Sequence, residues 1–365
     1  MRLLHNPFRR TGMPDLAGLK QVPVSTDPTE PLTLLRHCPA AAPTPLRENS
    51  RLAAALNVGG VFLKDESHRM GLGSFKALGA AYVIAREAAA TAGGVERLSN
   101  QATAARVLRG RVYTCASAGN HGLSVAAGAR IFGAHAVIYL SHTVPEAFER
   151  RLRHQGAEIV RVAGDYETSM AAAARDAESN GWTLLSDSSW PEYVDLPARV
   201  MEGYLVMGVE VADALSVPPD HVFLQAGVGG MAAATAAMLR KRWGDAPSII
   251  VVEPEAAPAL MESIRAGEPV RTRGPKSTMG RLDCKEPSYL ALAELARQAD
   301  YFATIDDAPC GETVELLARH RIATTPSGAA GIAALHHAGA FRDTLDIDER
   351  SRILAFITEA PEDLS

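Results

Sequence analysis

The sequence predicts an α/β protein with two lobes, in which mostly parallel, twisted sheets are flanked by helices. Its 365 residues exceed what one compact core of typical size needs. From about residue 60, short β-branched segments alternate with longer Ala- and Leu-rich segments, as in parallel sheets connected by helices. Nine such short segments favour two sheets over one: 61–63, 112–114, 136–140, 159–162, 183–185, 222–224, 249–252, 301–305 and 353–357.

The division into lobes follows from the spacing of these segments. The second to fourth lie close together between helical stretches, so we assign residues 85–184 to a smaller, mobile lobe. Residues 1–84 and 185–365 then form the larger lobe. The Pro-rich first thirty residues are expected to form an extended arm over the body, and the segments 39–45 and 88–101 to form loops or insertions.

Composition excludes several classes of partner. The formal net charge is −5 and no long basic run occurs, so neither nucleic acid nor an anionic membrane is an expected partner. The four cysteines are far apart and form no C-x-x-C pair, so we expect no metal site and no disulfide framework. No apolar segment has the length and flanks of a signal peptide or a membrane span. We therefore expect a cytoplasmic protein.

The first candidate for chemistry is the segment from Gly73 to Ala80, which contains Phe75 and Lys76. Its pattern predicts a glycine loop that opens a helix, with Lys76 in the first turn. The positive partial charge of a helix N-terminus and burial both lower the pKa of an amine, and only a neutral amine forms a Schiff base. A surface lysine explains the same local pattern at least as well.

The second candidate is a small-residue turn after the predicted strand at 112–114. It consists of Ser117, Ala118, Gly119, Asn120 and His121, followed by another glycine. A strand that passes through such a turn into a helix leaves backbone N–H groups able to bind a carboxylate, and the Asn120 amide adds a donor. A capping or core histidine remains the simpler interpretation of His121.

The third candidate is a glycine-rich turn between the predicted strand at 222–224 and an Ala-rich helix. Its central residues are Gly227, Val228, Gly229, Gly230 and Met231. Bare N–H groups and the helix dipole hold a phosphate in turns of this kind. A nucleotide would suit the turn equally well, although neither a Walker lysine nor a dinucleotide fingerprint accompanies it.

The fourth candidate is a helix start at 324–331, with Ser327 at or near the cap position. Serine is among the best N-cap residues, so simple capping explains this motif when it is taken alone.

Together and in this order, the four motifs resemble those of the fold-type II pyridoxal phosphate (PLP) enzymes, which include threonine and serine dehydratases, cysteine synthase and the tryptophan synthase β chain. The resemblance implies a tryptophan synthase β-like fold whose larger lobe binds PLP, and a homodimer. It implies that Lys76 bonds the cofactor beside Phe75. Asn120 would lie beside the 3′-oxygen, the turn from Gly227 to Met231 at the phosphate, and Ser327 at the pyridine nitrogen. The substrate carboxylate would lie on Ser117, Ala118, Gly119 and His121.

Within this family the motifs are most similar to those of the diaminopropionate ammonia-lyases. The shared features lie at 64–67, 186–193, 225–229, 279–287 and 356–359. The similarity implies a lyase that expels a β-substituent from a small amino acid and yields pyruvate and ammonia. It also implies that Asp187 assists the leaving amine, although an N-cap for the following helix explains this aspartate too.

Two departures leave the substrate open. Ala118 stands where these lyases have an acidic residue, which makes the loop similar to that of a hydroxy-amino-acid dehydratase, and Pro326 replaces a residue that is usually acidic or small. A dehydratase of serine, threonine or a bulkier or acidic β-hydroxy amino acid is therefore the main alternative. A PLP-binding protein without turnover is a more distant one.

Overall fold

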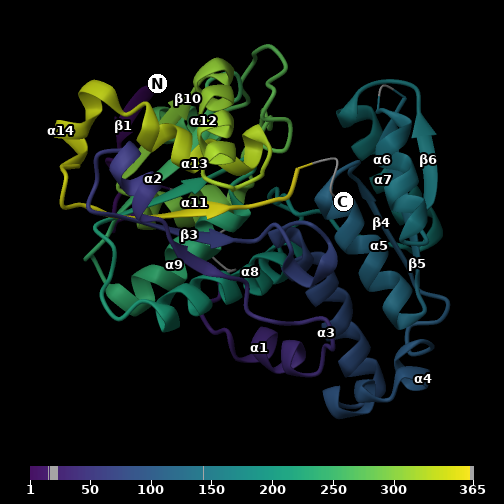
Figure 1. The fold of residues 1–365 in the computed structure, drawn as a ribbon. Coiled ribbons are helices and arrows are strands. Elements are labelled where there is room, and N and C mark those ends of the chain that lie inside the picture. The colour runs from purple at the N-terminus through teal and green to yellow at the C-terminus, as the bar shows by residue number, and fades with distance from the viewer. Residues whose placement is uncertain (15, 17–23, 143, 362–365) are drawn as a thin grey trace.

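The computed structural model describes residues 1–14, 16, 24–142 and 144–361, and it contains two separate sheets (Figure 1). A seven-stranded sheet has the order β1-β10-β9-β8-β11-β3-β2, and a four-stranded sheet has the order β6-β5-β4-β7. The strands are β1 (Arg2–His5), β2 (Leu46–Glu48), β3 (Gly60–Asp65), β4 (Val112–Ala116), β5 (His135–Ser141), β6 (Glu158–Val162), β7 (Thr183–Leu184), β8 (His221–Gln225), β9 (Ser248–Pro254), β10 (Tyr301–Ile305) and β11 (Arg352–Ile357). The predicted α/β class with parallel-rich sheets is confirmed.

Helices cover the sheets and connect their strands. The α-helices are α1 (Thr29–Arg36), α2 (Ser50–Ala55), α3 (Ala80–Ala92), α4 (Gln101–Ala104), α5 (Asn120–Phe132), α6 (Glu146–His154), α7 (Tyr166–Asn180), α8 (Asp195–Ala214), α9 (Gly230–Trp243), α10 (Ala259–Ala266), α11 (Tyr289–Gln298), α12 (Asp307–Arg319), α13 (Pro326–His336) and α14 (Arg342–Leu345). No helix in the described ranges combines the length and apolar character that crossing a bilayer requires.

All nine predicted strands are present, and two strands were missed. Every pairing among the nine is parallel, whereas β1 and β2 pair antiparallel with β10 and β3 at the two edges of the larger sheet. Edge strands are buried on fewer sides, so their sequences lack a continuous apolar run. The predicted N-terminal arm is therefore in part a strand, and residues 15 and 17–23 of it lie outside the described range.

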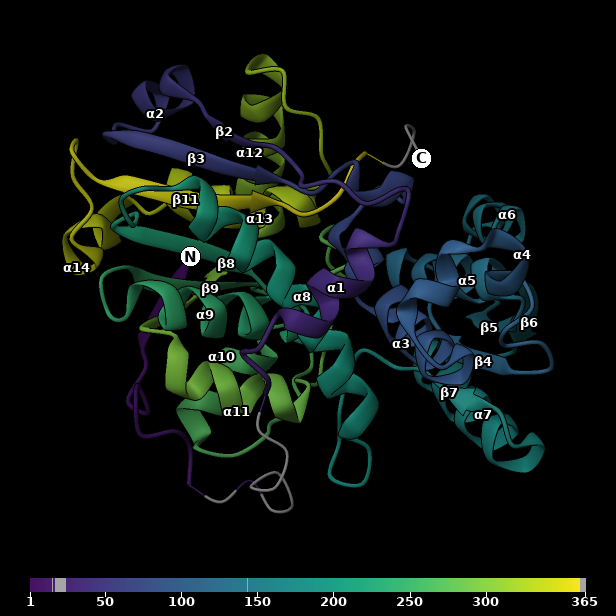
Figure 2. The same ribbon diagram turned by 90° about the horizontal axis from the view of Figure 1, so that it is seen from below.

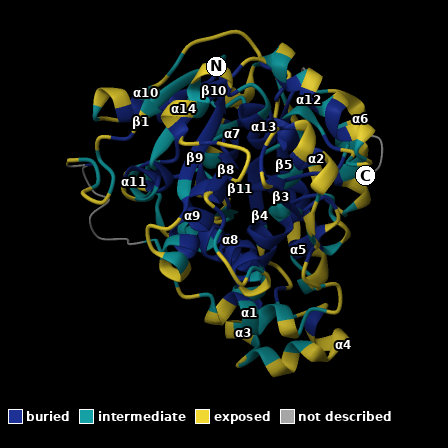
Figure 3. Cartoon of the chain, turned by 60° about the vertical axis from the view of Figure 1, so that its left-hand side comes forward, coloured by how far each residue is buried: buried dark blue, intermediate teal, exposed yellow. Residues whose placement is uncertain are grey.

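The central strands of the larger sheet are buried on both faces. Val222 and Leu224 of β8 pack in one core with side chains of α8, α9 and α11, whereas Phe223 between them packs in a second core with side chains of α13. Figure 2 places these two helix layers on opposite sides of the sheet, and the strands form the buried centre in Figure 3. Burial on two faces explains why these strands are continuous apolar runs.

The segment 88–101 is not a loop, so that prediction was wrong. Helix α3 continues to Ala92, and the 3₁₀ turn η4 (Val95–Ser99) and α4 follow. Alanine has the highest helix propensity, so an Ala-rich segment extends the helix. Gly93 ends it in the left-handed conformation with φ +76°. The segment 39–45 is irregular, as expected.

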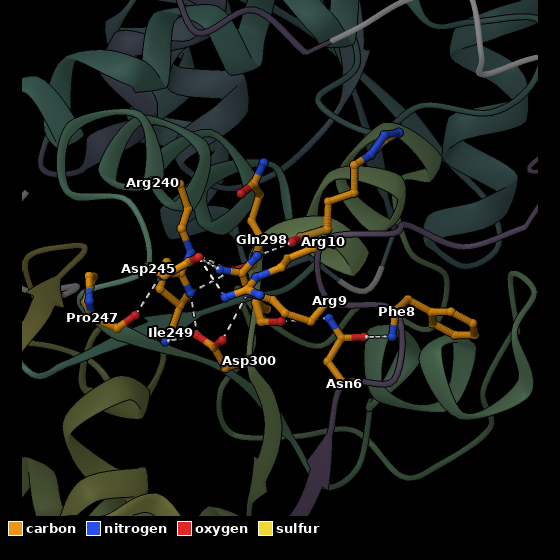
Figure 4. Close-up of polar contacts among 12 residues, drawn as sticks. Asn6, Phe8, Arg9, Arg10, Arg240, Asp245, Pro247, Ile249, Gln298 and Asp300 are labelled. Atoms are coloured by element: carbon orange, nitrogen blue, oxygen red, sulfur yellow. Dashed lines mark hydrogen bonds and ion pairs between the residues drawn. The ribbon is translucent and has the colours of Figure 1, made fainter.

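A network of arginines and aspartates fastens the N-terminal segment to the larger sheet (Figure 4). The Asp300 carboxylate accepts hydrogen bonds from the Ile249 amide (2.7 Å) and from Arg9 Nε (3.0 Å), and it pairs with Arg240. Arg9 also pairs with Asp245. One carboxylate therefore joins the start of β9, the end of α9 and the N-terminal segment.

We expect Asp300→Asn to lower the free energy of unfolding by about 1–3 kcal/mol, because the two arginines lose a charged acceptor in a partly buried setting. Urea denaturation followed by circular dichroism measures the loss. The control is Asp213→Asn, whose pair with Arg242 is exposed on both sides and should cost less than about 0.5 kcal/mol. Equal losses in the two variants would contradict the role given to Asp300.

Candidate active site

The loops at the carboxyl ends of the strands in both sheets meet at one place. Lys76 follows β3 of the larger sheet, Asp187 follows β7 of the smaller sheet, and the Lys76 ammonium pairs with the Asp187 carboxylate. The turns after β4 and β8 also end in this region, since His121 and Gly230 both lie near Asp187. Ligands of open α/β sheets characteristically bind at such carboxyl ends.

Lys76 lies in a short 3₁₀ turn, η3 (Phe75–Leu78), and not in the first turn of an α-helix as predicted. Ser74 caps this turn, with its hydroxyl accepting from the Lys76 amide at 3.3 Å. The Phe75 amide donates to Thr358 O (3.2 Å), and the Ala360 amide donates to Gly73 O (2.9 Å). The lysine turn is therefore held by the segment that follows the central strand β11.

Buried charges fix the segment between β3 and Lys76. Arg69 is 2 % exposed and donates to Glu66 (Nε to Oε2, 2.8 Å) and to Glu210 on α8 (Nη1 to Oε1, 2.8 Å). The Lys64 ammonium donates to Thr44 O (2.7 Å) and pairs with the same Glu210. Buried charges are tolerated only when they are paired, so this cluster specifies how the segment packs against α8.

Asp187 is held by its neighbours in the turn after β7. The Tyr193 hydroxyl donates to Leu184 O (2.7 Å) and accepts from the Ser186 amide (3.1 Å). The Ser188 amide donates to the Ser186 hydroxyl at 3.2 Å. Helix α8 begins only at Asp195, so the interpretation of Asp187 as its N-cap is wrong.

The Lys76 and Asp187 side chains are 21 % and 19 % exposed. Burial disfavours the ammonium, but the Asp187 carboxylate outweighs burial and raises the pKa of Lys76 above its ordinary value. Burial likewise disfavours the carboxylate, yet Lys76 and then His121 hold the pKa of Asp187 below its usual range. The sequence led us to expect a lowered pKa for Lys76. This expectation is wrong, because it did not include the effect of the Asp187 carboxylate.

The turn after β4 brings three predicted residues to the same place. Gly119 is the N-cap residue of α5, where no side chain caps the helix. The Asn120 amide donates to Glu359 Oε2 at 2.6 Å. His121 Nε2 lies 2.8 Å from Leu185 O, and its Nδ1 lies 3.9 Å from Asp187 Oδ2. Burial lowers the pKa of His121, so the ring is neutral near pH 7. Ser117 and Ala118 are half-buried beside it.

The glycine-rich turn after β8 opens α9 without a capping side chain. Gly229 is the N-cap residue with φ +101°, a conformation that favours glycine. A Cβ atom at Gly230 would lie 3.9 Å from both Asp187 O and the Tyr204 ring. Val228 O accepts from the Ser288 amide at 2.9 Å, and Met231 is buried within the helix. The first turn of α9 thus has no capping side chain, as an anion site at a helix start requires.

Ser327 lies inside the first turn of α13, and Thr325 is the cap residue. The Thr325 hydroxyl accepts from the Gly328 amide at 3.1 Å. The Ser327 hydroxyl accepts from the Arg281 amide at 3.1 Å, and the residue is 2 % exposed. N-capping therefore does not explain Ser327.

A family model for pyridoxal-phosphate dependent enzymes matches residues 38–359 of the chain. The chain belongs to this family. The diaminopropionate ammonia-lyase of Salmonella typhimurium is 31 % identical over 355 residues, covering 90 % of this chain and 88 % of the relative. The biosynthetic L-threonine dehydratase of Mycobacterium bovis is 30 % identical over 336 residues, covering 90 % and 70 %. The crystal structure of the Escherichia coli diaminopropionate ammonia-lyase with D-serine superposes with a TM-score of 0.88 at 26 % identity, covering 100 % of this chain and 94 % of that one.

PLP is the cofactor of this family member, and the residues present fit it. An aldehyde needs an amine, a phosphate needs unpaired N–H donors, and a pyridine nitrogen needs a polar partner. The Lys76 amine beside Asp187, the uncapped start of α9 and the buried Ser327 hydroxyl are groups of these three kinds, so they are the residues that would hold the cofactor.

Sequence reasoning missed several residues of this site. The Glu359 carboxylate accepts from Asn120 and Thr325 and lies 3.8 Å from Arg281. Glu359 and Arg281 fall within segments that carry the resemblance, but the residues around them in the sequence do not indicate what either side chain does. Tyr204 of α8 had no signal at all, because it is one apolar-face position in a buried helix.

We expect Asp187→Asn to speed the bonding of PLP to the apoenzyme at pH 8 by about tenfold. The carboxylate raises the pKa of Lys76, and each unit by which that pKa falls gives tenfold more neutral amine while the group is mostly protonated. The rate should level off at a lower pH in the variant. Growth of the visible absorbance band after mixing measures it.

The control for this experiment is Asp195→Asn, which changes an exposed carboxylate in the first turn of α8. Its bonding rate should match that of the unchanged protein at every pH. An Asp187→Asn rate that also matches would mean that Asp187 does not set the protonation of Lys76.

Proposed function

We propose that the protein is a PLP-dependent lyase that removes the β-substituent of a small amino acid, with 2,3-diaminopropionate as the first candidate substrate and pyruvate and ammonia as products. The observation that carries this proposal is the pairing of Lys76 with Asp187 between two uncapped helix starts. An amine base, a carboxylate to hold the leaving ammonium and two anion sites are the groups that elimination of a β-amine would use.

The relatives support the same reaction class. The chain covers 88 % of the diaminopropionate ammonia-lyase from Salmonella typhimurium. The Escherichia coli ammonia-lyase was crystallised with an aminoacrylate–PLP azomethine reaction intermediate, and that structure superposes with a TM-score of 0.87. Aminoacrylate is the product of losing a β-substituent.

PLP, when bound to Lys76, supplies the electron sink that stabilises negative charge at the substrate Cα. The uncapped N-terminus of α5 would bind the substrate carboxylate, and Asn120 would hold the 3′-oxygen of the cofactor. The Lys76 amine would accept the Cα proton once it is released. Asp187, adjacent to it, would hold the positive charge of a β-ammonium until that group departs as ammonia.

Ser327 would direct the reaction toward elimination. A neutral hydroxyl at the pyridine nitrogen does not hold a proton there as a carboxylate would, so less charge is drawn into the ring. Expulsion of the β-substituent is then favoured over transamination. The burial of Ser327 and its bond to the Arg281 amide keep that hydroxyl in place.

A dehydratase of β-hydroxy amino acids is the second candidate, because Ala118 leaves the turn after β4 without an acidic side chain. The 30 % identity to L-threonine dehydratase is in line with it. A β-hydroxyl carries no positive charge for the Asp187 carboxylate to hold, so Asp187 would matter less for this substrate than for a β-amine.

We also propose that residues 85–184 move as a smaller lobe relative to residues 1–84 and 185–365, and that the enzyme is a cytoplasmic homodimer. The four-stranded sheet lies within residues 112–184, which supports the upper boundary, whereas the lower boundary at residue 85 falls inside helix α3 (Ala80–Ala92). The four cysteines are unpaired, in keeping with a reducing compartment. Dimerisation is inferred from the family resemblance.

We expect the PLP-loaded enzyme to eliminate ammonia from 2,3-diaminopropionate faster than water from serine or threonine, with pyruvate or 2-oxobutyrate formation as the measurement. Asp187→Asn should reduce kcat/KM for diaminopropionate by about 100-fold and for serine by clearly less, because a β-amine depends more on a nearby carboxylate than a hydroxyl does. Asp195→Asn is again the control.

Three outcomes decide between the candidates. Preference for serine or threonine would favour the dehydratase. Equal slowing of both reactions in Asp187→Asn would reduce this aspartate to a structural role. Absence of turnover with every member of the panel would contradict the proposed function.

A further inference from the structure

Tyr204 of α8 buries a hydroxyl group that has no hydrogen-bond partner among the described residues. The residue is 1 % exposed, and its Oη atom is out of reach of solvent. Leaving a buried hydroxyl unpaired costs free energy, so such a group in a native protein needs an explanation. The other buried tyrosine hydroxyls nearby are paired, for example that of Tyr82 with Glu202 at 2.8 Å.

The Tyr204 ring is fixed directly against the lysine turn. It packs edge-on to Phe75 with ring centroids 5.1 Å apart. A Cβ atom at Gly79 would lie 2.6 Å from the Tyr204 hydroxyl, and one at Gly203 would lie 1.9 Å from Leu78 O. Helix α8 and the turn η3 are therefore in backbone contact, and the hydroxyl has little freedom to move elsewhere.

The hydroxyl is also close enough to the Lys76 amine for the two groups to interact, although no hydrogen bond of normal geometry joins them. Lys76 acts to lower the pKa of Tyr204, and Tyr204 acts to raise the pKa of Lys76. The amine itself pairs with Asp187. On its other side the Tyr204 ring lies 3.9 Å from a Cβ position at Gly230. Tyr204 thus lies between the lysine turn η3 and the start of α9.

We propose that Tyr204 is a positioning residue for Lys76, whose hydroxyl oxygen accepts an N–H of the released Lys76 amine when Asp187 is engaged with the substrate. This role rests on the proposed function. One N–H of the amine would point at Tyr204 Oη, which directs the nitrogen lone pair toward the substrate. The Cα–H bond then breaks, its proton forms the new N–H bond on Lys76, and the electron pair stays with the substrate. Tyr204 itself transfers no proton.

A neutral hydroxyl suits this task better than a carboxylate. Asp187 raises the pKa of Lys76 and so favours the ammonium, which cannot act as a base. A hydroxyl acceptor stabilises the ammonium much less. Burial raises the pKa of Tyr204, so the group remains protonated throughout turnover. The base would thus be oriented without being held in its charged form.

The test is Tyr204→Phe, which keeps the ring and removes the oxygen. Removing an unpaired buried hydroxyl should leave the melting temperature of the apoenzyme unchanged or raised. In the PLP-loaded enzyme, kcat should fall about tenfold because the base is less well oriented. The acid limb of the kcat–pH profile should move down by about half a pH unit, since the ammonium loses an acceptor.

The matched control is Tyr82→Phe, which removes a paired tyrosine hydroxyl from a neighbouring helix. Its melting temperature should fall, and its kcat–pH profile should keep the acid limb of the unchanged enzyme. An unchanged kcat in Tyr204→Phe would overturn the proposal. A lower kcat with an unmoved acid limb would overturn it too, because loss of packing has the same effect.

A second measurement separates this inference from the proposed function. Exchange of the Cα hydrogen of alanine in D₂O, followed by proton NMR, reports proton abstraction without any leaving group. Exchange that slows in Tyr204→Phe supports the role of Tyr204 even if no amino acid undergoes elimination. Exchange at the rate of the unchanged enzyme shows that Tyr204 does not position the base.

Discussion

The contact between the Lys76 ammonium and the Asp187 carboxylate is the interaction on which the site depends. The two residues are 111 positions apart, and each follows a strand of a different sheet. Their pairing in a partly buried place is stable only because the surrounding turns are fixed independently. The chain beyond β11 holds the lysine turn, and Tyr193 with the neighbouring serines holds the aspartate turn.

The proposed anion sites depend on the absence of capping side chains at two helix starts. Helices α5 and α9 begin at glycines with no capping side chain, whereas α13 nearby is capped by Thr325. Unpaired N–H groups at a helix start bind a carboxylate or a phosphate, while a capped helix has no need of one. Ser327 is therefore not needed as the cap of α13, and its hydroxyl accepts from the Arg281 amide instead.

The parallel strands and the four motifs could be predicted from the sequence, because strands buried on both faces are apolar runs and glycine turns follow them. The edge strands β1 and β2 could not, since their residues carry no such run. Family resemblance assigned Asp187 to the site, but its pairing with Lys76 was not predicted, because no local spacing relates residues of different sheets. For the same reason the predicted lysine pKa had the wrong direction. Roles for Tyr204 and Glu359 could not be predicted either, because these roles depend on residues that only the fold brings close to them.

The bond between Lys76 and PLP can be tested by peptide mass spectrometry of the yellow holoenzyme after reduction with borohydride, which converts a lysine–PLP bond into a stable link. We expect the added mass of reduced PLP on Lys76 and on no other lysine, and none in Lys76→Ala. A label on a different lysine, or a protein that never bonds PLP, would contradict this expectation.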